Sequence, residues 1–83
     1  MSLKLSFANE IHRVSKLPAN YNALIQVINK IFGTKLPTSW FIKYLDSEGD
    51  KIMMTSEEDF QSILSELKTT SQSIKLFIEE REN

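Results

Sequence analysis

The sequence predicts an α+β fold, a roll in which two helices cover one face of a mixed five-stranded sheet. Five short segments alternate apolar and polar residues as strands do, and two segments repeat apolar residues at helical spacing. Their order, β-β-α-β-β-α-β, has too many strands for a helical bundle and too few crossovers for a doubly wound sheet. The chain fits one small domain, residues 1–83, with a core at roughly residues 3–78. We expect a domain of this size to be a fragment of a longer protein.

The first strand is predicted at residues 3–7, where apolar and polar residues alternate. Alternation places Lys4 on the face opposite the apolar set. A tight two-residue turn then leads into a second strand at residues 10–16. Within that strand Ile11 and Val14 lie three positions apart, so either a bulge intervenes or Val14 lies near the strand end.

The first helix is predicted at residues 21–32, because apolar residues recur there at helical spacing. Asn20 is a suitable N-cap, since its side-chain oxygen can accept a hydrogen bond from a free backbone N–H of the first turn. Gly33 stands where a left-handed C-cap is expected. A loop that contains Pro37 is predicted at residues 34–39.

The second half of the chain begins with a strand predicted at residues 40–45, whose alternate residues face the core. A polar turn with a single glycine is predicted at residues 46–50, and a short strand at residues 52–54 returns from it. Either Thr55 or Ser56 can cap the second helix, because each stands three residues before an acid, the spacing of a capping box.

The second helix has an apolar stripe at helical spacing. The stripe consists of Phe60, Ile63, Leu64 and Leu67. A polar linker is predicted at residues 69–72, and a last strand at residues 74–78 precedes a charged tail at residues 79–83.

The net charge of −1 conceals one basic and one acidic part of the chain. Residues 1–43 hold six basic residues against one acidic residue, and residues 44–60 hold six acidic residues against one basic residue. The six acids are Asp46, Glu48, Asp50, Glu57, Glu58 and Asp59. Carboxylates this close in sequence repel one another, and a cation outside the turn would relieve the repulsion.

The acids fit a calcium loop only in part. Counted from Asp46, they fall at positions 1, 3, 5 and 12 of an EF-hand loop, but Lys51 stands at position 6, where glycine is needed. A predicted strand also precedes the loop in place of a helix. We therefore expect no metal site and no cofactor. The simplest interpretation is a solvated turn followed by acids that interact favourably with a helix N-terminus.

Several classes of function are disfavoured by composition. Paired carboxylates need a pocket that raises one pKa before they act as acid and base, and a solvated turn offers none. With one histidine, no cysteine and no glycine-rich phosphate loop, we expect no enzyme. The isoelectric point near 5.8 disfavours nucleic-acid binding. No apolar stretch approaches the ~20 residues of a membrane helix. The absence of cysteine fits a reducing, cytoplasmic setting.

From residue 44 to residue 60, an aromatic residue, two acids, a glycine, a third acid and further helix acids follow in order. The residues concerned are Tyr44, Asp46, Glu48, Gly49, Asp50, Glu57, Glu58, Asp59 and Phe60. This segment resembles the acidic OPCA motif of the Phox and Bem-one (PB-one) domains. Residues 3–7 and 10–13 resemble the basic cluster of the same family.

The resemblance implies a ubiquitin-like β-grasp with an acidic and a basic interaction face. The implied acidic face is formed by Asp46, Glu48, Asp50, Glu57, Glu58 and Asp59. The implied basic face is formed by Lys4, His12 and Arg13. The family often has arginine where His12 stands and a further basic residue where Ser6 stands, so this basic face is thinner.

The partners that the resemblance implies are proteins, either PB-one domains of other chains or copies of this chain. In a β-grasp the first two strands and the acidic turn lie at opposite sides, so the acids of one molecule cannot reach its own Lys4. Contact is then head to tail, and such contact propagates unless something caps it. We expect a scaffold, adaptor or signalling module that forms hetero- or homo-oligomers.

A second interpretation is a ubiquitin-like domain that binds a different protein through the open face of its sheet. Phe41 and Phe77 are predicted to point away from the core on two strands that are candidates for neighbours. Two outward phenylalanines can form a contact patch, although single exposed apolar residues are common.

Overall fold

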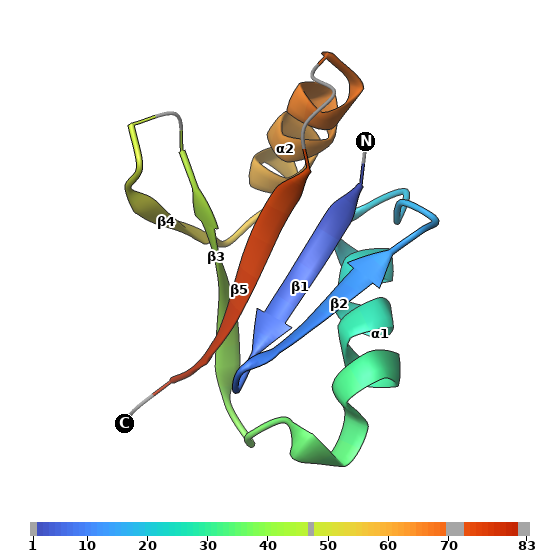
Figure 1. Ribbon diagram of the computed structural model, residues 1–83, viewed down its shortest axis with the longest axis vertical. Helices are drawn as coiled ribbons and strands as arrows, with labels where there is room; N and C mark the ends of the chain where they lie inside the picture. Colours follow the sequence, from blue (N-terminus) through green and yellow to red (C-terminus); the bar gives the residue numbers. More distant parts are fainter. Residues whose placement is uncertain (1, 47, 70–72, 82–83) are drawn as a thin grey trace.

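Five strands form one mixed sheet in a computed structural model of the chain, which describes residues 2–46, 48–69 and 73–81 (Figure 1). The strands are β1 (Leu3–Phe7), β2 (Glu10–Val14), β3 (Trp40–Leu45), β4 (Lys51–Met54) and β5 (Ile74–Glu80). Their order across the sheet is β2-β1-β5-β3-β4. β1 and β5 pair in parallel, and the other neighbouring pairs are antiparallel. The predicted mixed sheet and α+β class are confirmed.

The hairpin between β1 and β2 turns through two residues with positive φ, Ala8 at 50° and Asn9 at 69°. Positive φ at both central residues is the geometry of a type I′ turn, which matches the right-handed twist of the flanking strands. The register is continuous up to the pairing of Leu3 with Val14, so Val14 lies at the strand end and no bulge intervenes. β2 therefore ends two residues before the predicted boundary.

α1 (Tyr21–Phe32) has the predicted bounds and the predicted N-cap. The Asn20 side chain accepts the N–H of Ala23 at 2.7 Å. Gly33 is the C-cap residue and has a positive φ of 49°, but its ψ of −118° lies outside the left-handed helical region, so the predicted left-handed conformation is wrong. A single 3-10 turn, η1 (Gly33–Lys35), follows within the segment that was predicted as a loop.

α2 (Glu57–Thr69) is capped by Ser56, the second of the two predicted candidates. The Ser56 hydroxyl accepts the N–H of Asp59 at 3.3 Å, and the Asp59 carboxylate accepts the N–H of Thr55 at 3.0 Å. The helix includes the first residue of the predicted linker, whose remaining residues, 70–72, lie outside the described parts of the chain. Neither helix is long and apolar enough to cross a membrane, for the residues described.

Both helices lie behind the sheet in Figure 1, and the core fills the space between the two layers. The buried core residues are Leu3, Leu5, Val14, Leu24, Ile28, Phe32, Ile42, Met54, Phe60, Ile63, Leu64, Leu67, Leu76 and Ile78. They include the whole predicted stripe of the second helix. The opposite face of the sheet, called the open face below, has no helix over it among the described residues.

β5 continues through residues that were predicted as the start of a charged tail. Glu79 pairs with Phe41 of β3, and its carboxylate lies 3.6 Å from the ammonium nitrogens of Lys43 and Lys51. The predicted strand ended at its last apolar residue, at position 78. Cross-strand pairing and these two ion pairs extend the observed strand beyond that position.

Candidate protein-interaction surfaces

The turn between β3 and β4 gathers three carboxylates, those of Asp46, Glu48 and Asp50, which we call the acidic turn. One oxygen of each lies within 4.8 Å of the others. Asp46 Oδ1 accepts the N–H groups of Glu48 and Asp50, each at 2.9 Å, and Gly49 supplies a φ of +86°. Asp46 therefore shapes the turn, and Glu48 and Asp50 are exposed on it.

The acidic turn has no counter-charge within the described residues. In the described parts of the chain, the acids that form ion pairs are Glu10 and Glu79, and neither belongs to the acidic turn. Three adjacent carboxylates repel one another, and a low local dielectric would strengthen that repulsion. Among the described residues, these three acids form the group that is close enough to hold a cation. Exposed acids commonly lie this close without binding one.

Two of the three acids in the first turn of α2, Glu57 and Asp59, accept backbone hydrogen bonds near the start of a helix. Both oxygens of Glu57 accept the N–H of Tyr21, at 3.0 and 3.2 Å, so this carboxylate caps α1 from the neighbouring helix. Glu57 also accepts a hydrogen bond from Gln61 at 2.7 Å. The hydrogen bond from the Thr55 N–H lowers the pKa of Asp59 below its ordinary value, against a smaller effect of desolvation. Glu58 is exposed and makes neither an ion pair nor a side-chain hydrogen bond with the described residues.

The six predicted acids therefore differ in the contacts that their carboxylates make. The acidic turn is one cluster, and Glu57 and Asp59 are engaged in capping helices. The capping role of Asp59 was predicted from its spacing to Ser56. The role of Glu57 was not, because its partner Tyr21 lies 36 residues away in the sequence.

Lys4 and Arg13 lie side by side on the open face, because the register of β1 and β2 pairs them directly. Alternation turns both side chains away from the buried Leu3, Leu5 and Val14. Neither makes an ion pair with any described residue. Two of the three predicted basic residues are thus adjacent.

His12 lies on the opposite face of the sheet from Lys4 and Arg13. It pairs with the buried Leu5, and its ring meets Phe32 of α1 edge-on at 5.1 Å between centroids. Adjacent residues of a strand point to opposite faces, so His12 and Arg13 do not share one surface. The structure does not bring His12 together with the other two predicted basic residues.

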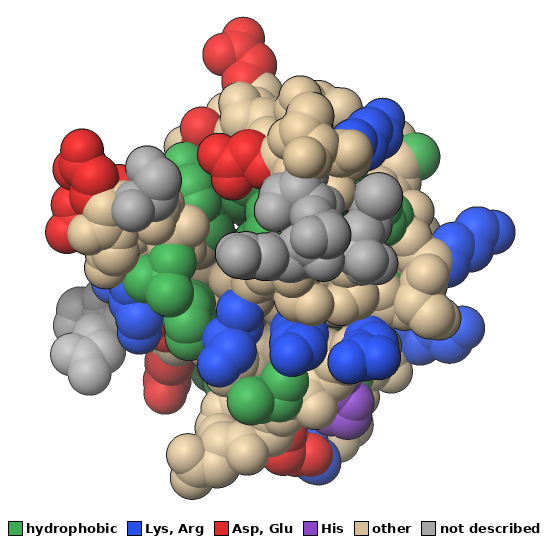
Figure 2. Space-filling view, turned by 45° about the horizontal axis from the view of Figure 1, so that its top comes forward, with side chains coloured by type: hydrophobic (Ala, Val, Ile, Leu, Met, Phe, Trp, Pro, Cys, Tyr) green, Lys and Arg blue, Asp and Glu red, His purple; other side chains and the backbone are tan. Residues whose placement is uncertain are grey.

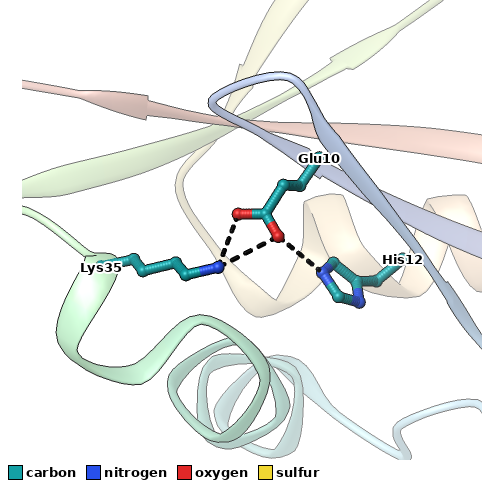
Figure 3. A network of polar contacts seen from close by, with 3 residues as sticks. All are labelled: Glu10, His12 and Lys35. Atoms are coloured by element: carbon teal, nitrogen blue, oxygen red, sulfur yellow. Dashed lines mark hydrogen bonds and ion pairs between the residues drawn. The ribbon is translucent and has the colours of Figure 1, made fainter.

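His12 belongs instead to a small polar network beside α1 (Figure 3). Its Nε2 lies 3.8 Å from a Glu10 oxygen, and the Lys35 ammonium donates to both Glu10 oxygens at 2.9 and 3.1 Å. The contact with Lys35 lowers the pKa of Glu10 below its ordinary value. This network ties η1 to the start of β2.

Lys75 of β5 also lies beside Lys4, because the parallel register pairs the two residues. Its neighbour Leu76 is buried, so alternation places Lys75 on the open face. Arg13, Lys4 and Lys75 therefore form a row across β2, β1 and β5, which we call the basic row. Figure 2 shows Lys and Arg side chains aligned across this side of the molecule. Lys75 was not among the basic residues predicted from the sequence.

Phe41 and Phe77 point to the open face on the neighbouring strands β3 and β5, and both residues are half-buried. The Lys51 ammonium lies 4.3 Å from the centre of the Phe77 ring, and Lys43 lies 5.4 Å from the centre of the Phe41 ring. The ion pairs of both lysines with Glu79 hold these cations over the rings. Cations of the same domain thus lie over both rings, and the two lysines share the carboxylate of Glu79.

The sequence of the chain matches the PB1 domain family over residues 1–81. The chain belongs to the PB1 domain family. PB1 domains are protein–protein interaction modules and are not typically catalytic. The resemblance to PB-one domains is thereby confirmed at the level of the family.

A solved structure titled "AtNBR1-PB1 domain" is similar in fold to this PB1 domain. Its TM-score is 0.72, and the alignment covers 98% of this chain and 97% of the other at 14% sequence identity. At that identity the likeness shows the common ubiquitin-like fold alone. No curated protein matches the sequence significantly.

In this PB1 domain the acidic turn and the basic row occupy different parts of the sheet. The acidic turn joins the edge strand β4 to β3, and the basic row begins at the other edge strand, β2. The row ends at Lys75 on β5, the neighbour of β3, and no ion pair links the two clusters among the described residues.

Proposed function

We propose that this PB1 domain pairs head to tail with other PB1 domains, or with copies of itself. The acidic turn of one domain would lie against Lys4 and Arg13 of the next. The observation that carries the proposal is the presence of two charge clusters of opposite sign in one molecule, neither of which has a counter-charge within the described residues. A second domain of the same kind supplies both missing counter-charges.

The physical role of such charge pairs is to set orientation and the rate of encounter. Exposed ion pairs stabilise a contact weakly, and in a pair that loses water on binding the attraction must first offset the cost of desolvation. The contact joins two different surfaces, so each complex leaves a free acidic end and a free basic end. A module with these properties fits a scaffold, adaptor or signalling protein, and the cysteine-free sequence supports a cytoplasmic setting.

The test uses two variants that each keep one charged surface. Glu48→Gln/Asp50→Asn removes two charges from the acidic turn and keeps Asp46, whose side chain shapes the turn. Lys4→Ala/Arg13→Ala removes the adjacent cations from the open face. We expect neither variant to self-associate, and their mixture to form a dimer that stops at two subunits, measured by multi-angle light scattering.

A matched control removes two lysines far from the open face. Lys30 and Lys68 are exposed on the helices behind the sheet, and Lys30→Ala/Lys68→Ala changes the net charge by the same amount as Lys4→Ala/Arg13→Ala. It should leave association unchanged. If the two complementary variants are folded but do not bind each other, the assignment of the two surfaces is wrong.

The alternative, a partner bound at Phe41 and Phe77, stays a prediction. The lysines over both rings reduce the apolar area that such a partner would meet. An NMR titration distinguishes the two functions, because the alternative requires chemical-shift changes at the phenylalanines and our proposal requires them at Lys4 and in the acidic turn.

A further inference from the structure

We propose that Lys75 is a binding residue of the same basic surface, so that the three carboxylates of a partner's acidic turn meet a row of three cations. The inference deepens the proposed function and rests on it. Its occupant is the acidic turn of another PB1 domain or of a second copy of this chain.

The geometry of the sheet makes Lys4 the centre of the basic row. Arg13 pairs with Lys4 across the antiparallel β1–β2 contact, and Lys75 pairs with Lys4 across the parallel β1–β5 contact. All three side chains lie on the open face, and neighbouring strands are about 4.8 Å apart, so the row spans about 10 Å. Without Lys75 the cations would end at β1, and with it the row reaches the central strand, β5.

The row is electrostatically unfavourable within the isolated domain. Like charges on directly opposite strand positions destabilise a sheet, and Lys4 has one on each side. None of the three forms an ion pair with a described residue. Lys43 and Lys51, on the same face, both pair with Glu79. The lysines of β3 and β4 thus share one carboxylate, that of Glu79, whereas the three cations of the basic row have none among the described residues.

Lys75 is half-buried and its ammonium lies 5.6 Å from the centre of the Phe77 ring. The closer position over that ring, at 4.3 Å, is taken by Lys51. Phe77 pairs with Ser6 in the register of β1 and β5, two residues along from the pair of Lys4 and Lys75, so the ring lies beside the row. The attraction of the ring for a cation helps to hold the Lys75 ammonium on the open face.

The acidic turn is complementary to this row in charge and in number. One oxygen of each of its three carboxylates lies within 4.8 Å of the others, so the cluster is about half as long as the row and fits over Lys4, between the two outer cations. A partner that placed this cluster over Lys4 would bring carboxylates near Arg13 and Lys75 as well. The repulsion within each cluster is relieved in the same contact.

The test measures the affinity between the two complementary variants by isothermal titration calorimetry. Lys75→Gln is introduced into the Glu48→Gln/Asp50→Asn protein, which keeps the basic row, and the partner is the Lys4→Ala/Arg13→Ala protein, which keeps the acidic turn. We expect Lys75→Gln to weaken binding by about three- to tenfold and to reduce the dependence of binding on salt. Lys30→Gln in the same background is the matched control and should change neither.

Two further measurements separate a direct contact from a general charge effect. Combining Lys75→Gln with Glu48→Gln or Asp50→Asn in the partner should give a non-additive loss for at least one acid, as in a double-mutant cycle. Thermal unfolding should show that Lys75→Gln is folded and at least as stable as its parent, because it removes a like charge from the row.

The outcomes are distinguishable. If Lys75→Gln binds like its parent, while Lys4→Ala in that background abolishes binding, the inference about Lys75 is wrong and the proposed function stands. If Lys75→Gln and Lys30→Gln weaken binding equally, Lys75 has no place in the surface. If the two complementary proteins do not bind at all, the proposed function and the inference are both wrong.

Discussion

Ala8 adopts a backbone conformation that favours glycine or asparagine. Its φ of 50° belongs to the left-handed region, where a Cβ atom approaches the following carbonyl oxygen. The type I′ turn requires this conformation at both central residues, and Asn9 tolerates it better than alanine does. The first hairpin, which carries Lys4 and Arg13, therefore contains a local strain at an exposed position.

Ala8→Gly should stabilise the domain. Removing the Cβ relieves the strain, and the greater freedom of glycine in the unfolded chain offsets part of the gain. We expect the free energy of unfolding to rise by about 0.5 to 1 kcal/mol, measured by urea denaturation. Ala8→Val is the control, because a β-branched residue is least tolerated at positive φ and should lower the stability. A loss of stability in Ala8→Gly would contradict the turn geometry.

Single residues also show how alternation assigns surfaces. His12 and Arg13 are adjacent in β2 and therefore face opposite sides of the sheet. This consequence was available from the sequence, since alternation already placed Lys4 away from the apolar set. The family resemblance grouped His12 with Arg13 by position in a motif, and a motif does not specify which face each residue occupies.

At the scale of elements, Glu57 connects the two helices. Its carboxylate accepts the N–H of Tyr21 at the start of α1, although it belongs to the first turn of α2. The N-terminus of a helix carries partial positive charge, so an ionised carboxylate is well placed there. An acid that the motif assigned to an interaction face thus holds the helical layer together.

Glu57→Ala should lower stability and leave the acidic turn intact. We expect the free energy of unfolding to fall by about 1 kcal/mol, since a cap to α1 and the contact with Gln61 are lost together. Glu58→Ala, at the exposed neighbouring position, should change it by less than about 0.5 kcal/mol. Urea denaturation of both variants measures the difference, and equal losses would show that the contact with Tyr21 is unimportant.

The whole molecule has a net charge near zero but carries an acidic and a basic cluster in different places. The acidic turn joins β3 to β4, and the basic row lies on β2, β1 and β5. Opposite clusters on one molecule favour association of unlike surfaces, and such association is not closed by symmetry. The near-neutral total is therefore compatible with a strongly electrostatic interaction.

Self-association of the wild-type domain should depend on salt. Raising the salt from about 0.05 M to about 0.5 M shortens the Debye length about threefold and weakens contacts between exposed charges. We expect the mean mass from light scattering to grow with protein concentration at low salt and to fall towards the monomer at high salt. A monomer at both salt levels and high concentration would mean that the partner is a different PB1 domain and that the chain does not polymerise.

Local patterns were sufficient to predict most elements of this fold. The bounds of α1 and its two caps follow from apolar spacing, Asn20 and Gly33, all of which act within a few residues. The turn at residues 46–50 follows from its glycine and its polar residues. The class of fold follows from the order of elements, because few architectures cover both helical stripes with one sheet.

The sequence by itself determined the elements, the face on which Lys4 lies and the gathering of Asp46, Glu48 and Asp50 in one turn. Only the tertiary structure decided that Lys75 lies beside Lys4 and that Glu57 caps α1. The physical reason is the range of the interactions. Capping, turns and alternation act between near neighbours, whereas the parallel pairing of the first and last strands depends on how both helices pack over the completed sheet.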